Sequence, residues 1–318
     1  MVTICFLSPF KPISYLPTTS ISSSPINPKP STLKCKASLP TLVTTEPDPV
    51  FTSVKAFAPA TVANLGPGFD FLGCAVDGLG DHVTVRVDPA VRPGEISIAD
   101  IIGPGKLSTN PLWNCAGIAA ISVMKMLQIR SVGLSLSLEK GLPLGSGLGS
   151  SAASAAAAAV AVNEIFGKKL TSQELVLAGL ESEAKVSGYH ADNIAPAIMG
   201  GFVLIRSYDP LELKPLKFPS DKDLLFVLVS PEFEAPTKKM REALPLEIGM
   251  VHHVWNSSQA GALVAAVLEG NVAELGKALS SDKWKMVEAF WKVGNLKAVS
   301  VVKKLDRVGA RMVDGVRR

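Results

Sequence analysis

The sequence predicts an α+β fold. Segments in which polar and apolar residues alternate, as in strands, mix with segments of helical periodicity. No regular strand–helix–strand repeat connects them, which disfavours a doubly wound parallel sheet. The chain has 318 residues, of which 47% are hydrophobic, so it is long enough for one large domain or for two ordinary domains with cores of their own. Prolines cluster between residues 209 and 220, and we expect the domains to span 49–210 and 211–318.

The elements of the first half follow from these patterns. Strands are predicted where polar and apolar residues alternate, helices where apolar residues recur every three or four positions, and a loop where turn residues gather. In chain order we expect a strand at 54–58, a turn-rich loop at 59–70, a strand at 82–88, a helix from Asn110, a strand at 132–140 and a helix at 150–166.

The second half begins with a helix start signal. Thr171 and Glu174 have the spacing of a capping box, which predicts a helix from there to about residue 185. Apolar runs and periodicity predict the remaining elements. They are strands at 199–206 and 224–230, helices at 251–269 and 272–281, and a weak strand at 296–303.

Residues 1–48 differ in composition from the rest of the chain. They are rich in Ser, Thr, Pro and Lys, contain no Arg, and have no acidic residue before Glu46. This is the composition of an organelle transit peptide, and the absence of Arg favours a plastid over a mitochondrion. We therefore expect a transit peptide and a chloroplast location. A disordered tail is the alternative interpretation.

The net charge of +4 originates in this leader. The chain has 32 Lys and Arg against 28 Asp and Glu, and four of the lysines lie in residues 1–36. Their removal leaves 28 basic against 28 acidic residues, so the composition does not indicate a nucleic-acid-binding surface. The most apolar run, 152–162, is too short to span a bilayer. We expect a soluble protein with neither a nucleic-acid nor a membrane partner.

The cysteines predict no covalent or metal framework. Cys5 and Cys35 lie in the leader, and Cys74 and Cys115 have no paired spacing. Neither a disulfide network nor a zinc site is therefore expected.

One segment, residues 143–154, carries the chemistry. Three glycines alternate with small or apolar residues, and two serines then open a run of alanines. Glycines let backbone N–H groups approach a ligand closely, and a helix N-terminus attracts anions. The segment therefore predicts a phosphate-binding loop. A plain flexible loop before a buried helix is the alternative. A Walker loop requires a Lys after its last glycine, and none follows Gly149. The glycine spacing also differs from that of a dinucleotide-binding fingerprint.

The segment resembles the central motif of the GHMP kinase family, Pro-x-Gly-x-Gly-Leu-Gly-Ser-Ser-Ala. Within that family, residues 59–70 (PATVANLGPGFD) and 188–201 (GYHADNIAPAIMGG) are similar to the first motif and the substrate segment of homoserine kinases. With a plastid-type leader, the similarity is to the plant enzymes. It implies the two-domain GHMP kinase fold, with an N-terminal domain like ribosomal protein S5 and a C-terminal ferredoxin-like domain. It also implies ATP-dependent phosphorylation of the side-chain hydroxyl of L-homoserine, in threonine biosynthesis, by a homodimer.

The resemblance implies roles for individual residues. Ser151 and Glu183 match the Mg²⁺ ligands, although Glu181 is close enough to be confused with Glu183. Asn193 would lie near the reacting hydroxyl and the γ-phosphate as the catalytic residue, and the neighbouring Asp192 is not assigned as a base. ATP would contact Asn110, Pro143, Leu144, Gly145, Ser146, Gly147, Leu148, Gly149, Ser150, Ser151, Ala152, Ala153 and Ser154. Homoserine would contact Asn64, Asp70, His190, Asn193, Thr237 and Arg241.

The family pattern breaks near the C-terminus. A second glycine motif, of the type Gly-x-Gly-Pro-Thr, is expected after Arg206 and is not found in the sequence. The residues around 283 pass directly into a segment that resembles the late C-terminal helix, so we expect the second domain to be truncated internally there. Loss of sheet strands would expose apolar faces and an unpaired edge. The resulting hypothesis is a chain that is weakly active or inactive, and poorly stable. The alternatives to homoserine kinase activity are another GHMP kinase and a non-catalytic ligand-binding variant.

Overall fold

A computed structural model of the chain describes residues 45–318 except residue 104 and segments 187–189, 232–246 and 281–297. Its larger sheet has seven strands, with the order β3-β4-β2-β1-β9 and the hairpin β5-β6 attached to β2. All neighbours in it are antiparallel except β3 and β4. The strands are β1 (Phe51–Leu65), β2 (Gly68–Val87), β3 (Ile96–Ile102), β4 (Leu134–Glu139), β5 (Phe202–Tyr208), β6 (Leu211–Leu216) and β9 (Arg311–Arg317).

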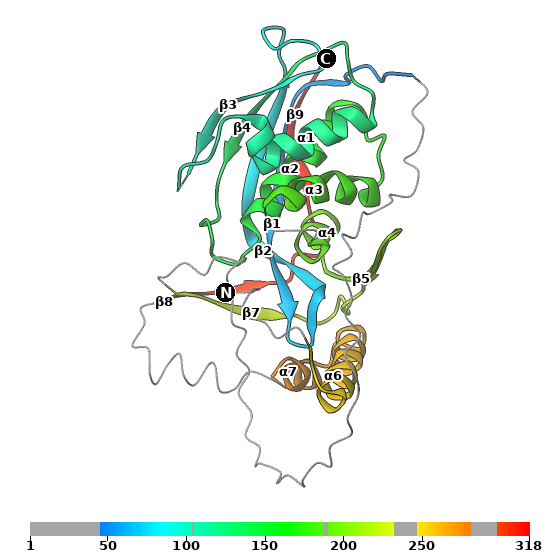
Figure 1. Ribbon diagram of the computed structural model, residues 1–318. Helices are drawn as coiled ribbons and strands as arrows, with labels where there is room; N and C mark the ends of the chain where they lie inside the picture. Colours follow the sequence, from blue (N-terminus) through cyan, green and yellow to red (C-terminus); the bar gives the residue numbers. More distant parts are fainter. Residues whose placement is uncertain (1–44, 104, 187–189, 232–246, 281–297) are drawn as a thin grey trace.

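Four helices cover one face of this sheet (Figure 1). They are α1 (Cys115–Met126), α2 (Ser150–Ile165), α3 (Ser172–Val186) and α4 (Ala191–Met199). Helices α2 and α4 contact β1 and β2, while α1 and α3 pack against α2. The alanines of α2 are fully buried, and their small side chains let the helix lie close to the sheet. A helix that is apolar all round is expected inside a protein, which explains why α2 forms the centre of the core.

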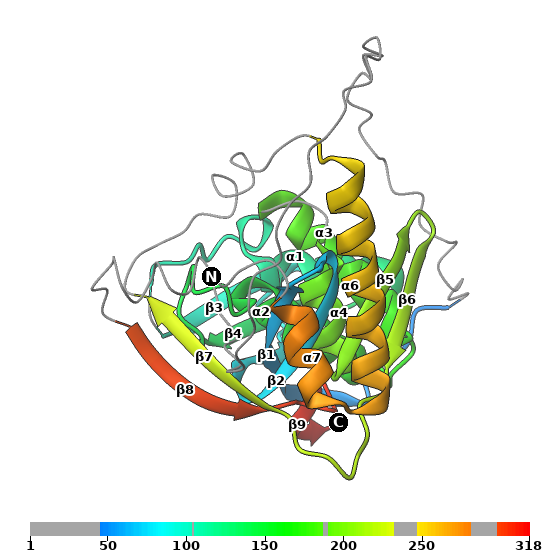
Figure 2. The same ribbon diagram turned by 90° about the horizontal axis from the view of Figure 1, so that it is seen from below.

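The remaining elements form a second, smaller group. Strands β7 (Leu225–Pro231) and β8 (Ala298–Lys304) pair antiparallel in a sheet of their own. Helices α6 (Met250–Glu269) and α7 (Val272–Leu279) lie side by side, as Figure 2 shows. After β8 the chain returns to the larger sheet, where the Asp306 N–H donates to the Ala75 carbonyl at 3.0 Å. No helix among the described ranges is long and apolar enough to cross a bilayer.

The predicted α+β class is confirmed, and most predicted elements recur within a few residues. The capping box is confirmed in detail: the Thr171 N–H donates to Glu174 Oε2 at 2.8 Å, and the Glu174 N–H donates to Thr171 Oγ1 at 3.3 Å. The predicted strands and helices of the second half correspond to β5, β7, α6, α7 and β8.

Two predictions about the first half are wrong. Residues 59–70 are not a loop, because β1 continues to Leu65 and β2 begins at Gly68, leaving a turn of two residues between them. Backbone pairing such as Val62 with Cys74 outweighs the turn residues of the segment. The helix expected from Asn110 begins at Cys115 instead, since Asn110 and Pro111 start a short 3₁₀ turn (111–113).

The sheet topology bears on the predicted domain division. Strand β6, which follows residue 210, pairs with β5, and β9 pairs with β1. Both strands therefore belong to the larger sheet, although the prediction placed them in 211–318. Four elements had no sequence signal that we recognised: β3, α4, β6 and β9. The division into two domains stays a prediction.

Candidate active site

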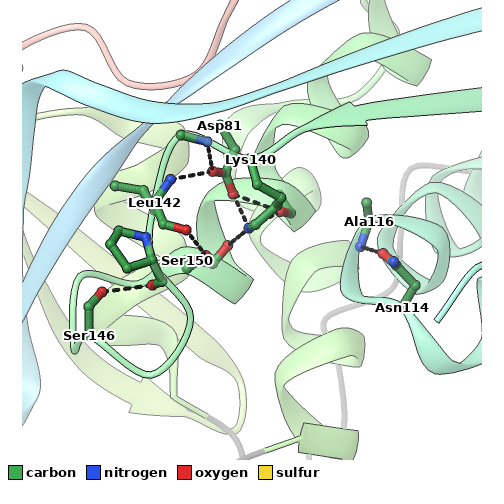
Figure 3. Close-up of polar contacts among 10 residues, drawn as sticks. Asp81, Asn114, Ala116, Lys140, Leu142, Ser146 and Ser150 are labelled. Carbon is green, nitrogen blue, oxygen red and sulfur yellow. Dashed lines mark hydrogen bonds and ion pairs between the residues drawn. The ribbon is translucent and has the colours of Figure 1, made fainter. Parts of the chain in front are cut away.

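The glycine loop connects β4 to α2 with an unusual backbone. Gly145, Gly147 and Gly149 all have positive φ, at 68°, 75° and 66°. Residues with a Cβ rarely adopt this conformation, which explains the alternation of glycine in the sequence. The Ser146 hydroxyl donates to the Pro143 carbonyl at 2.8 Å and closes a turn inside the loop, as Figure 3 shows.

Helix α2 starts immediately after this loop, with Gly149 as its N-cap residue. The Ala153 N–H donates to the Gly149 carbonyl at 2.8 Å, which is the first turn of the helix. The N–H groups before Ala153 have no partner within the helix, as at every helix N-terminus. Together with the positive end of the helix dipole, they form a site suited to phosphate oxygens.

A buried ion pair anchors both ends of the loop (Figure 3). The Lys140 ammonium, at the end of β4, pairs with Asp81 of β2, and their side chains are only 2% and 1% exposed. Lys140 Nζ also donates to the Ser150 carbonyl at 2.9 Å and to Ser154 Oγ at 2.7 Å. The other Asp81 oxygen accepts the N–H groups of Gly141 and Leu142 at 3.0 and 3.2 Å. The start of the loop and the first turn of α2 are thus tied to one carboxylate–ammonium pair.

Asn193 of α4 lies beside the loop. Its Oδ1 accepts a hydrogen bond from the Thr61 hydroxyl at 2.9 Å, and the Thr61 N–H donates to the Leu148 carbonyl at 3.0 Å. A Cβ built on Gly149 would lie 2.1 Å from Thr61 Oγ1 and 3.1 Å from Asn193 Oδ1. Strand β1, the glycine loop and α4 therefore converge at one point.

A second group of polar residues gathers at the β1–β2 turn. The Asn64 side chain accepts the Asp70 N–H at 3.0 Å, and both residues have positive φ. His190 Nδ1 lies 3.8 Å from Asp70 Oδ1, where a protonated imidazole would form an ion pair. The Tyr208 hydroxyl donates to the Asp70 carbonyl at 3.3 Å and accepts the Ala191 N–H at 3.1 Å. His190 is 120 residues from Asp70 in the sequence, and the fold brings it beside the local Asn64–Asp70 pair.

The two candidate acidic ligands of α3 differ in burial. Glu183 is 3% exposed, whereas Glu181 lies on the exposed face of the helix. Burial, with the Glu183 carboxylate as the second cause, raises the pKa of the nearby Cys115 thiol to about 12. The charge of Lys140 acts on the same thiol in the opposite direction. Glu183 and Lys140 therefore both act on Cys115, and Glu183 is the buried one of the two glutamates.

Asn110 has a local structural role as well. Its side chain accepts the Leu112 N–H at 3.0 Å and caps the 3₁₀ turn. The cap of α1 is Asn114, whose Oδ1 accepts the Ala116 N–H at 3.0 Å (Figure 3).

Two predicted substrate residues, Thr237 and Arg241, lie outside the described residues. No group of three or more His, Cys, Asp or Glu that could hold a metal ion occurs within the part of the chain that the structure describes. A Mg²⁺ site there would have to combine side-chain oxygens with phosphate and water oxygens, which is usual for this ion.

Sequence reasoning missed four polar residues of the site: Thr61, Asp81, Lys140 and Tyr208. Asp81 and Lys140 carried a sequence signal, because each is a charged residue beside an alternating strand pattern. The structure buries both of them. Thr61 lies in the motif at 59–70, but nothing local indicated its Asn193 partner, 132 residues away. Tyr208 carried no signal, because its Asp70 partner is 138 residues away.

Comparison with known proteins identifies the family. The family described as GHMP kinases N terminal domain matches residues 115–201. The chain is 67% identical to the homoserine kinase of Arabidopsis thaliana over 370 aligned residues that cover all of both chains. It is 43% identical to the homoserine kinase of Chloroherpeton thalassium, over 71% of this chain and 73% of the relative.

Comparison with solved structures agrees with this family assignment. The crystal structure of homoserine kinase from Cytophaga hutchinsonii matches with a TM-score of 0.72 at 30% identity. The match covers 82% of this chain and 98% of that chain. The chain therefore has the fold of the GHMP kinases.

The Arabidopsis alignment also bears on the predicted internal gap. It spans 370 positions, 52 more than the 318 residues of this chain, so the relative has residues without a counterpart here. This agrees with the absence of the second glycine motif, while the predicted junction near residue 283 lies outside the described residues. High identity over the whole length, a matching domain family and a shared fold lead to one conclusion: the chain belongs to the homoserine kinase family of GHMP kinases.

Proposed function

We propose that this chain transfers the γ-phosphoryl group of ATP to the side-chain hydroxyl of L-homoserine. The observation that carries the proposal is the convergence at Gly149. There Gly149 caps the N-terminus of α2, which is suited to phosphate, and a Cβ placed on this glycine would lie 3.1 Å from the Asn193 amide oxygen. Such an arrangement holds a triphosphate beside a neutral hydrogen-bonding side chain.

The loop from Pro143 to Ser154 would bind the phosphates of ATP. Its free N–H groups and the dipole of α2 suit the phosphate charges, and Asn110 would contact the nucleoside. The oxygens of Ser151 and Glu183 would hold Mg²⁺, since a hydroxyl and a carboxylate are ligands that this ion prefers. When bound, Mg²⁺ neutralises charge on the transferring phosphoryl group.

The polar group at the β1–β2 turn would bind the amino acid. Asp70 carries a partly exposed carboxylate, suited to the ammonium group of homoserine, and Asn64 fixes its backbone. His190 would contact the substrate from the start of α4. Thr237 and Arg241 would supply the carboxylate contact, because a guanidinium binds a carboxylate through paired N–H bonds.

Catalysis would rest on positioning rather than on a strong base. Asn193 cannot accept a proton from the hydroxyl at neutral pH, and the adjacent Asp192 is buried, with 1% of its surface exposed. Phosphoryl transfer proceeds through a loose transition state in which alignment and charge stabilisation supply most of the rate. The Asn193 amide would hold the γ-phosphoryl group and the substrate hydroxyl in line.

The assay that tests the function measures ADP release by the purified 318-residue chain. We expect release with ATP and L-homoserine, and none above background with mevalonate or without an acceptor. Release with mevalonate alone would favour another GHMP kinase, and nucleotide binding without release would favour the non-catalytic variant. The Arabidopsis relative, run in parallel, shows whether the internal gap lowers turnover. Equal turnover would refute the hypothesis that this chain is weakly active.

The metal assignment yields its own prediction. Glu183→Gln should raise the Mg²⁺ concentration for half-maximal binding of an ATP analogue about tenfold, because a charged ligand oxygen is replaced by a neutral one. Glu181→Gln is the matched control, two residues away on the exposed face, and should leave that concentration unchanged. Isothermal titration with the β,γ-imido analogue of ATP measures both variants. An equal shift in both variants would contradict the assignment of Glu183.

Three further assignments belong to the same proposal. Residues 1–48 would act as a plastid transit peptide, which would place the enzyme in the chloroplast. Residues 49–210 and 211–318 would form an N-terminal ATP-binding domain and a C-terminal domain. The enzyme would act as a homodimer on a small-molecule substrate. Similarity to a plant enzyme and the composition of the leader support the first of these.

A further inference from the structure

Thr61 is fully buried on β1 and makes two different contacts at the candidate active site. Its backbone N–H donates to the Leu148 carbonyl in the glycine loop, and its side-chain hydroxyl donates to Asn193 Oδ1. A single residue thus connects the loop that would hold the phosphates to the side chain that would act on them. Neither contact is needed for the β1–β2 ladder, which pairs Thr61 with Ala75 through the backbone.

The hydroxyl contact restricts the Asn193 amide. A primary amide has one acceptor oxygen and one NH₂ group with two donors, and rotation by 180° exchanges them. The Thr61 hydroxyl, at 2.9 Å, occupies the oxygen side as a donor. The NH₂ side is therefore directed away from Thr61, and it is the only side of the amide that can donate to an anionic oxygen.

We propose that Thr61 is a positioning residue that orients the Asn193 amide, so that its NH₂ group donates to the γ-phosphate. The inference rests on the proposed function, because it needs a nucleoside triphosphate in the glycine loop. Thr61 itself does not touch the nucleotide. Its hydroxyl acts through Asn193, whereas its backbone N–H holds the loop in any variant other than proline.

The test compares two nucleotides rather than rates alone. Thr61→Val keeps the shape of the side chain and the backbone N–H, and removes only the hydroxyl. It should weaken binding of the β,γ-imido analogue of ATP about tenfold, the effect of losing one buried hydrogen bond. Binding of ADP, which has no γ-phosphate, should not change. Thr61→Ser restores the hydroxyl and should bind both nucleotides as the unmodified chain does.

The pathway through Asn193 is tested by combining variants. Asn193→Ala should show the same selective loss of the triphosphate analogue, and Thr61→Val added to it should cause no further loss. Thr84→Val, a half-buried threonine on the neighbouring strand β2, is the control for loss of a hydroxyl from this sheet. Circular dichroism and thermal unfolding check that each variant is folded.

The outcomes separate the inference from the proposed function. Selective loss in Thr61→Val, rescued by serine and absent in the Asn193→Ala background, would support the inference. Equal weakening of both nucleotides, or none, would overturn it while leaving the function intact. If Thr61→Val does not fold, the Asn193→Ala variant alone tests the inference. Equal weakening of ATP-analogue and ADP binding in that variant would overturn it, because Asn193 would then not act on the γ-phosphate. An unmodified chain that binds neither nucleotide would overturn the proposed function, and the inference with it.

Discussion

Lys140→Met is expected to lower the free energy of unfolding by about 3–5 kcal/mol, the usual cost of removing one partner from a buried ion pair. The methionine fills the space of the lysine stem but leaves the Asp81 carboxylate buried without its counter-ion. It also removes the donor that holds the Ser150 carbonyl and the Ser154 hydroxyl. The loss therefore affects stability and the shape of the glycine loop together.

A matched control lies next to it in the sequence. Glu139 forms an ion pair with Lys55 across the same sheet, at 2.7 Å, but their side chains are 44% and 33% exposed. Solvent screens such a pair, so Lys55→Met should cost less than about 1 kcal/mol. The two pairs differ in burial and in the further hydrogen bonds of Lys140 to Ser150 and Ser154, so the comparison measures these two effects together.

Equilibrium denaturation in urea measures both variants, with the slope of the transition recorded to confirm that the unfolding reaction is the same. We also expect Lys140→Met to weaken binding of the ATP analogue, because the first turn of α2 loses its anchor. If Lys140→Met were no more destabilising than Lys55→Met, the anchoring role of the Lys140–Asp81 pair would be wrong.

Gly149→Ala is expected to lower the phosphorylation of homoserine at least about a hundredfold, the effect of displacing reacting groups by roughly 1 Å. Two terms act together. Gly149 has a φ of 66°, which costs alanine about 1 kcal/mol. Its new Cβ would lie 2.1 Å from Thr61 Oγ1, so either the loop or β1 must move. Both movements separate the α2 N-terminus from Asn193.

Gly145→Ala is the matched control for the conformational cost of placing alanine at a positive φ. Gly145 has nearly the same φ, 68°, and no atom lies within 4 Å of the Cβ position there. This variant should show only the conformational cost, a loss of about fivefold to tenfold in the occupancy of the loop conformation.

Binding of the ATP analogue and ADP release, measured for both variants, give the comparison. A similar small loss in the two variants would show that the close approach at Gly149 has no functional weight.

Local sequence was sufficient for the glycine loop and the helices beside it. The alternation of glycine at 145, 147 and 149 reflects a backbone requirement that those residues meet individually, and all three have positive φ. The alanines after Ser150 favour a helix through their own propensity. The Thr171–Glu174 box acts over three residues, and its hydrogen bonds form as expected. In each case the physical cause lies within one turn of chain.

The other strands and the contacts of the site depend on pairing between segments that are far apart in the sequence. Residues 59–65 contain turn formers, but the ladder with β2 makes them strand, and β9 joins β1 although more than 240 residues separate them. The Asp81–Lys140 and Thr61–Asn193 contacts likewise join residues 59 and 132 positions apart. Their energies come from burial and from partners that only the folded chain brings together. The sequence by itself thus determined the family, the α+β class and the phosphate loop. The tertiary structure decided which side chains anchor that loop and which one lies beside it.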